Sequence, residues 1–204
     1  MMEIWNEAIV EKSWRLLQYL HRRYDFVLIG GWAIYFYTKS LKSKDIDFVT
    51  TIEELKRIGL EMNIHKNERL RRYEIKLRGI DVDIYIPYWS KLIVPPEDII
   101  ENARIVEGFK IADVEDIIIL KLDAEIDRKR SIKGFKDRVD IIALLLSGFV
   151  DKERLHKKVH RYGGEKYLRE LERIIVEAQD EFYYLGINNP RDIKKFKNRM
   201  IKNL

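Results

Sequence analysis

The chain has 204 residues, of which 46% are hydrophobic and 11% aromatic, enough for one large or two small globular domains, and this argues against global disorder. Its 39 lysines and arginines exceed its 34 acidic residues, and a net charge of +5 is compatible with a polyanionic partner without establishing one. The absence of cysteine excludes disulfides, thiolate metal sites and cysteine nucleophiles.

No apolar run approaches the roughly 20 residues that a membrane helix needs, and the acidic, amphipathic start does not resemble a signal peptide. We therefore expect a soluble cytoplasmic protein without a membrane partner. The composition is rich in Ile, Lys and Glu and has only two glutamines, which favours a thermophilic source.

The first half of the chain alternates helical and extended patterns. Apolar spacing predicts helices over 4–23, 32–40 and 52–63. Short β-rich runs predict strands over 25–30 and 45–51. Two alternating runs joined by a glycine-containing turn predict a hairpin of strands 72–77 and 80–86. A connector with two prolines over 90–98 is followed by a strand or short hairpin over 103–112.

After residue 112 the pattern is helical only. We predict helices over 113–130, 135–149, 151–163, 165–186 and 189–203, the last of which opens on Asn189-Pro190. The sequence therefore predicts an α+β protein: a small mixed β-sheet core flanked by helices, over residues 1–112, and a helical C-terminal domain over 113–204.

Two carboxylates stand two residues apart in the predicted strand 45–51. Because side chains alternate along a strand, Asp45 and Asp47 should share one face while Ile46 and Phe48 point to the core. Two carboxylates on one face repel each other unless a cation neutralises them.

The predicted strand 80–86 repeats this arrangement with Asp81 and Asp83. If the two strands are neighbours, up to four carboxylates converge. Oxygen ligands of this kind suit Mg²⁺, which accepts one or two carboxylates together with water and phosphate oxygens. Two such ions, about 3.5–4 Å apart, could hold the attacking and leaving oxygens of a phosphoryl transfer.

Gly30 and Gly31 lie between a predicted strand and a predicted helix. Glycine lets the backbone approach a ligand closely, and the amides at a helix start bind anions such as a triphosphate. We expect this pair to hold phosphates beside the carboxylates.

These motifs resemble those of the DNA polymerase β-type nucleotidyltransferase superfamily. The resemblance rests on "GGWA", "KSKDIDF" and "VDIYIP", and the later segments "ILKLDAEIDR" and "KDRVDIIALL" are similar to its minimal toxin- and abortive-infection-like subgroup. It implies that Asp45, Asp47 and Asp83 are catalytic and bind two Mg²⁺ or Mn²⁺ ions, with Asp83 as the base; Asp81 is the alternative to Asp83.

The same resemblance implies a set of nucleotide-binding residues. These are Gly30, Gly31, Ser43, Lys44, Lys121 and Asp137, with Asp140 as the alternative to Asp137. Arg71, Arg72 and Tyr73 also lie near the expected site, where a guanidinium could meet a phosphate.

The resemblance thus implies a Mg²⁺-dependent transfer of a nucleoside monophosphate from an NTP to a hydroxyl of RNA, tRNA, a protein or a small molecule. Alternatively, the fold could serve as a non-catalytic binding module that acts as an antitoxin-like partner, which an exposed apolar stripe with Phe182, Tyr183 and Tyr184 would favour. A plain RNA binder is a third possibility, because the segment from Asn188 carries six basic residues and one acid.

Overall fold

A computed structural model describes residues 7–129 and 131–202 of the chain. Its Cα packing divides the chain into two compact units, Met1–Asp113 and Val114–Leu204. Among the described residues, no helix is both long and apolar enough to cross a membrane.

The first unit is built on strands separated by helices. Its helices are α1 (Glu7–His21), α2 (Gly30–Thr38), α3 (Ile52–Glu61) and α4 (Pro96–Glu101). Its strands are β1 (Val27–Ile29), β2 (Ile46–Val49), β3 (His65–Asn67), β4 (Arg72–Leu77), β5 (Ile80–Tyr85), β6 (Arg104–Val106) and β7 (Phe109–Ile111).

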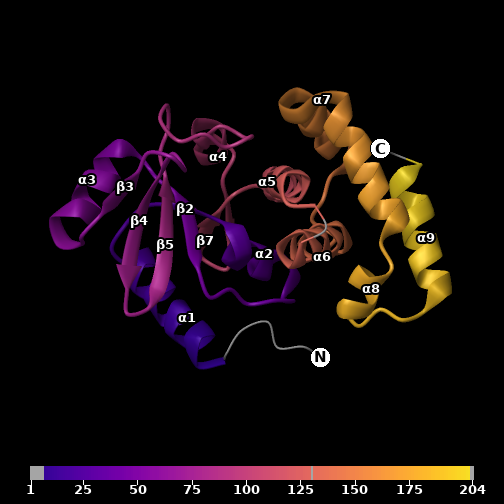
Figure 1. Cartoon of the computed structure of the whole chain (residues 1–204), viewed down its shortest axis with the longest axis horizontal. Coiled ribbons are helices and arrows are strands. Elements are labelled where there is room, and N and C mark those ends of the chain that lie inside the picture. Colours follow the sequence, from indigo (N-terminus) through magenta and orange to yellow (C-terminus); the bar gives the residue numbers. More distant parts are fainter. Residues whose placement is uncertain (1–6, 130, 203–204) are drawn as a thin grey trace. The chain divides into compact units, whose positions relative to one another are not determined.

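Within the described part of this unit the strands form one seven-stranded mixed sheet in the order β3-β4-β5-β2-β1-β7-β6. β2 runs parallel to β5 and antiparallel to β1, and β1 runs parallel to β7. The β4–β5 hairpin therefore stands directly beside β2, as Figure 1 shows. Because β2 and β5 are neighbours, the acidic residues of these two strands can come together.

The core of this unit is aromatic and aliphatic. Phe48 and Ile84 point to the same face of the sheet and are almost fully buried. On α2, Trp32 packs against Trp14 of α1 with ring centroids 5.2 Å apart, and its indole N–H donates to Ser13 Oγ at 2.9 Å. That hydrogen bond satisfies the one polar group that a buried tryptophan carries. The core thus fixes α2 against α1.

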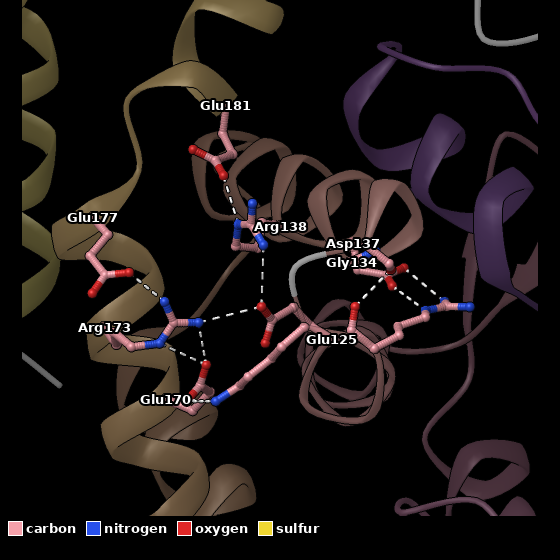
Figure 2. Close-up of polar contacts among 11 residues, drawn as sticks. Glu125, Gly134, Asp137, Arg138, Glu170, Arg173, Glu177 and Glu181 are labelled. Atoms are coloured by element: carbon pink, nitrogen blue, oxygen red, sulfur yellow. Dashed lines mark hydrogen bonds and ion pairs between the residues drawn. The ribbon is translucent and has the colours of Figure 1, made fainter.

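The second unit is helical. Its helices are α5 (Val114–Asp127), α6 (Ile132–Leu146), α7 (Lys152–Glu177), α8 (Asp180–Tyr184) and α9 (Pro190–Ile201). Glu125 of α5 is fully buried and accepts hydrogen bonds from Arg138 of α6 and Arg173 of α7, while Arg138 also donates to Glu181 of α8 at 2.7 Å (Figure 2). One charged network therefore ties four helices together.

The α+β fold class, with its mixed sheet and helical C-terminal region, is confirmed. Several boundaries differ from the sequence-based prediction. β3 was not predicted, because its three polar residues lack strand alternation. α4 begins within the predicted connector over 90–98 and continues to Glu101, and Pro96 occupies its first turn, where proline is tolerated. α7 consists of two helical segments that meet at a kink at the non-helical Gly164, so the predicted break between 151–163 and 165–186 is present. The second segment ends at Glu177, and the short α8 follows it, whereas the prediction ran to 186.

Candidate catalytic carboxylate site

The sheet register brings acidic side chains from three strands into one row. Asp47 on β2 lies opposite Asp83 on the parallel strand β5, and Asp83 lies opposite Glu74 on β4. Directly paired residues point to the same face of a sheet, and neighbouring strands are about 4.8 Å apart. Three carboxylates therefore share one face, opposite to that of the buried Phe48 and Ile84.

Asp45 and Asp81 occupy the margins of this row. Asp45 precedes β2, which begins at Ile46, so the prediction of two aspartates within one strand is wrong for Asp45. Pairing with β1 ends at Asp47, because the chain of β1 turns there into α2. Lys44 Nζ lies 3.9 Å from Asp45 Oδ1. Asp81 is exposed and lies opposite Lys76, two residues away from the register position that Asp83 shares with Asp47.

The glycine pair packs directly against the carboxylate row. Gly30 has φ +65°, and a Cβ there would lie 2.3 Å from Asp47 Oδ2. A Cβ on Gly31 would lie 2.6 Å from Ser43 Oγ, and Ser43 is buried. Only glycine combines this backbone conformation with such close approach. At the start of α2, Gly30 therefore lies against Asp47, and Gly31 lies against Ser43.

Arg72, two residues before Glu74 on β4, lies beside the acidic row and contacts two of its members. Its Nη1 lies 2.7 Å from Asp83 Oδ2, and its Nε donates to Glu74 Oε1 at 2.8 Å. Asn67 Nδ2 also donates to Glu74 Oε1, at 2.9 Å. The guanidinium therefore supplies positive charge to two of the three carboxylates.

The charges at this row perturb Asp83 most. Burial raises the pKa of Asp83 to about 7, and the negative charges of Asp47, Glu74 and Asp45 act in the same direction, while Arg72 opposes them. Burial and the negative charges of Asp47 and Asp83 also raise the pKa of Tyr85. By contrast, the hydrogen bond from Arg72 lowers the pKa of Glu74. At Asp83, the effect of the Arg72 guanidinium on the pKa is therefore smaller than the combined effect of burial and the neighbouring carboxylates.

The donor set suits a hard divalent cation. Asp47 and Asp83 offer the one or two carboxylates that Mg²⁺ commonly takes from a protein, with water and phosphate oxygens completing its shell. The raised pKa of Asp83 also indicates that this position would gain from a nearby positive charge. In the described part of the chain, however, no three His, Asp or Glu side chains are gathered into a ready metal site.

Lys121, Asp137 and Asp140 come together in the helical unit. Lys121 Nζ of α5 lies 3.1 Å from Asp137 Oδ1 and 2.7 Å from Asp140 Oδ2 of α6. Burial alone would lower the pKa of Lys121, but the charges of Asp140 and Asp137 outweigh burial and raise it. Arg128 forms a bidentate ion pair with Asp137, which Figure 2 labels together with Gly134. A Cβ at Gly134 would lie 2.5 Å from the Arg128 carbonyl oxygen.

Sequence reasoning missed two members of the site. Glu74 and Tyr85 share a face with Asp83, but only the register of three strands reveals this. Arg72 was expected nearby as a phosphate ligand, whereas in the structure it pairs with Asp83 and Glu74. A signal was available, because Arg72 and Glu74 alternate with the inward-facing Tyr73 and Ile75 along β4.

No protein-family model matches the chain, and no curated protein matches its sequence. Solved structures do share its fold. JHP933 from Helicobacter pylori matches with a TM-score of 0.54 at 17% identity, over 97% of this chain and 95% of that one. A candidate nucleotidyltransferase from H. pylori matches with a TM-score of 0.51 at 17% identity, over 97% and 98%.

The antibiotic-resistance factor ANT(2'')-Ia matches with a TM-score of 0.51 at 15% identity, over 79% of this chain and 95% of that one. At these identities the likeness concerns the fold. The chain therefore shares its fold with these proteins, one of which is described as a nucleotidyltransferase, and its carboxylate row lies where β2 pairs with β5.

Proposed function

We propose that the protein is a Mg²⁺-dependent nucleotidyltransferase, which transfers a nucleoside monophosphate from an NTP to a hydroxyl and releases pyrophosphate. One observation carries this proposal: Asp47 and Asp83 share a register position on parallel strands, and Gly30 at the start of α2 packs against Asp47. The carboxylate pair that would bind the metal thus lies next to the Gly30 backbone that would contact the phosphates, as binding of a metal-bound triphosphate requires.

In this mechanism Asp45, Asp47 and Asp83 would hold two Mg²⁺ or Mn²⁺ ions. Bound Mg²⁺ would neutralise phosphate charge and favour in-line displacement. The backbone at Gly30 and Gly31 would approach the triphosphate, with Ser43 supporting Gly31 and Lys44 adding positive charge. Lys121 and Asp137, which pair with each other in the helical unit, are assigned to nucleotide binding by the resemblance alone.

The acceptor oxygen would attack the α-phosphorus. A new oxygen–phosphorus bond forms, the bond from that phosphorus to the bridging oxygen breaks, and pyrophosphate leaves. Asp83 would take the hydroxyl proton as a general base. The chain's main contribution would be positioning and charge neutralisation.

The later segments around Lys121 and Asp137 favour the toxin- and abortive-infection-like subgroup. On this reading RNA, and tRNA in particular, is the first acceptor to test, followed by protein hydroxyls and small molecules. The assay supplies each NTP labelled at its α-phosphate, together with Mg²⁺ and cellular RNA or protein. Label should appear in the acceptor.

Asp47→Asn should abolish this transfer without unfolding the protein, because the amide keeps the shape but loses the charge. Asp81→Asn is the matched control, since Asp81 is exposed and lies opposite Lys76. Full transfer by a folded Asp47→Asn variant would refute the assignment.

The ion pair between Arg72 and Asp83 favours a second candidate, a non-catalytic binding module. A guanidinium that stays on Asp83 would keep a metal ion away from it. Calorimetry separates the candidates, because a module without turnover or nucleotide affinity gives no heat with any NTP and Mg²⁺. Of the apolar stripe expected for this candidate, Phe182 is fully buried, whereas Tyr183 is exposed.

A further inference from the structure

A cationic and aromatic patch lies at the open end of the β4–β5 hairpin. We define it by Lys66, Arg69, Arg71, Tyr88 and Trp89. The Trp89 ring is contacted on several sides: Lys66 Nζ lies 5.1 Å and Arg71 Cζ 5.2 Å from its centroid, and the Tyr73 ring lies 4.7 Å away. The proposed transfer reaction does not use any of these five residues.

The backbone of the patch is held in place at both of its segments. Arg71 Nε donates to the Trp89 carbonyl at 3.0 Å, and Ser90 Oγ accepts from the Ile86 amide at 3.0 Å. Asn67 Oδ1 accepts from the Leu70 amide at 3.0 Å. Such bonds orient side chains before a ligand arrives, which lowers the entropy that binding would lose.

Two residues of the patch have strained backbones. Tyr88 has φ +63° and Arg71 has φ +52°, a region that bulky side chains rarely adopt. Strain of this kind persists where surrounding contacts enforce it, and it is concentrated at functional sites. The result at Tyr88 is an aromatic side chain that is 86% exposed, against 45% for Tyr183 and 43% for Tyr19.

The charge of the patch is positive. Lys66, Arg69 and Arg71 contribute three cations, and Glu68, which pairs with Lys66 at 2.7 Å, is the acid among them. Cations that follow a phosphate backbone, combined with aromatic rings on which bases stack, are the means by which proteins bind single-stranded nucleic acid.

We propose that this patch binds a single-stranded nucleic acid. The affinity for the strand does not depend on the proposed transfer activity, whereas a role of the bound strand as acceptor rests on that activity.

The test measures binding of a fluorescein-labelled RNA of about 12 nucleotides, a length within the usual range for such sites, by fluorescence anisotropy without NTP or metal. Tyr88→Ala should weaken binding about 5- to 150-fold, the range for loss of one base stack. Tyr88→Phe should bind as the wild type does, because the ring remains. Circular dichroism shows whether each variant is folded.

Tyr19→Ala is the matched control. Tyr19 is also an exposed tyrosine with an arginine over its ring, Arg23 at 5.2 Å, but it lies on α1. Its loss should leave RNA binding unchanged. Arg69→Gln should lower the slope of log affinity against log salt by about 0.7, the value for one phosphate contact of a single strand.

Several results would overturn the proposal. One is unchanged RNA affinity in a folded Tyr88→Ala variant. Another is a loss of RNA affinity on Lys194→Gln and Lys195→Gln, which would place the strand on the exposed basic face of α9. A third is a loss of NTP affinity in Tyr88→Ala with RNA affinity intact, which would assign the ring to the base of the NTP.

Failure of this inference and failure of the proposed function are distinguishable. If Tyr88→Ala transfers label to a protein or small molecule normally and the wild type does not bind RNA, only the patch assignment fails. If RNA binds through Tyr88 but no NTP supports transfer to any acceptor, the transferase assignment fails and the binding site remains.

Discussion

Asp83→Asn should make the metal-free protein more stable above neutral pH. The folded protein raises the pKa of Asp83 from its ordinary value of 3.8 to about 7. Folding therefore favours the protonated form, so the stability that Asp83 contributes is fully present below pH 3.8 and is lost as the pH rises through about 7. At about 1.4 kcal/mol per pH unit, the upper limit of this loss is about 4 kcal/mol.

Asparagine resembles the protonated carboxyl and does not ionise. The difference in free energy of unfolding between variant and wild type should therefore be smallest at low pH and grow in favour of the variant up to about pH 8. Urea unfolding followed by tryptophan fluorescence measures it. All four tryptophans precede residue 90, so the signal reports on the first unit alone: Trp5, Trp14, Trp32 and Trp89.

Asp81→Asn is the control, because Asp81 is exposed on the same strand and should change stability little at any pH. A difference in unfolding free energy between Asp83→Asn and wild type that does not vary with pH would contradict the raised pKa of Asp83. The same pH dependence in Asp81→Asn would also contradict it, because the effect would then come from the loss of any negative charge on this strand and not from the burial of Asp83.

Three further outcomes are expected. Gly31→Ala should destabilise the protein by about 1–3 kcal/mol through its clash with Ser43, and Ser43→Gly in the same chain should recover part of that loss in urea unfolding. Lys121→Met should cost about 3–5 kcal/mol, because it leaves Asp140 buried without its cation; urea unfolding followed by circular dichroism measures this. Arg72→Gln should tighten Mg²⁺ binding about tenfold in calorimetry, because it removes a charged bond worth about 1.5–3 kcal/mol that competes for the same oxygens.

The sequence predicts the fold well where local patterns decide it. Alternation along β5 places Asp83 opposite to the buried Val82 and Ile84, and the structure has this pattern. The transition from mixed to all-helical structure after residue 112 is also visible from periodicity alone. Helix ends and the three-residue strand β3 were missed, because a segment of two or three residues is too short to show a periodic pattern.

The candidate site was harder to predict, because it depends on long-range register. The sequence suggests that two acidic strands are neighbours, but only the pairing shows that Asp83, and not Asp81, lies beside Asp47. Glu74 comes from a third strand, and Arg72 fills the space between Glu74 and Asp83. A single sequence does not contain the sheet order that puts these side chains in contact.

The ion pair between Arg72 and Asp83 separates the two candidate functions. If Arg72 is a permanent counter-ion, Mg²⁺ should add little stability to the wild type, although it stabilises the Arg72→Gln variant. If Arg72 only substitutes for a metal ion until the nucleotide arrives, Mg²⁺ should replace the guanidinium and stabilise the wild type as well. The freed guanidinium would then lie beside the triphosphate, where a fork of N–H donors matches phosphate oxygens. The negative charge of the carboxylate row can thus be neutralised either by Arg72 or by bound Mg²⁺, and the proposed transfer requires bound Mg²⁺.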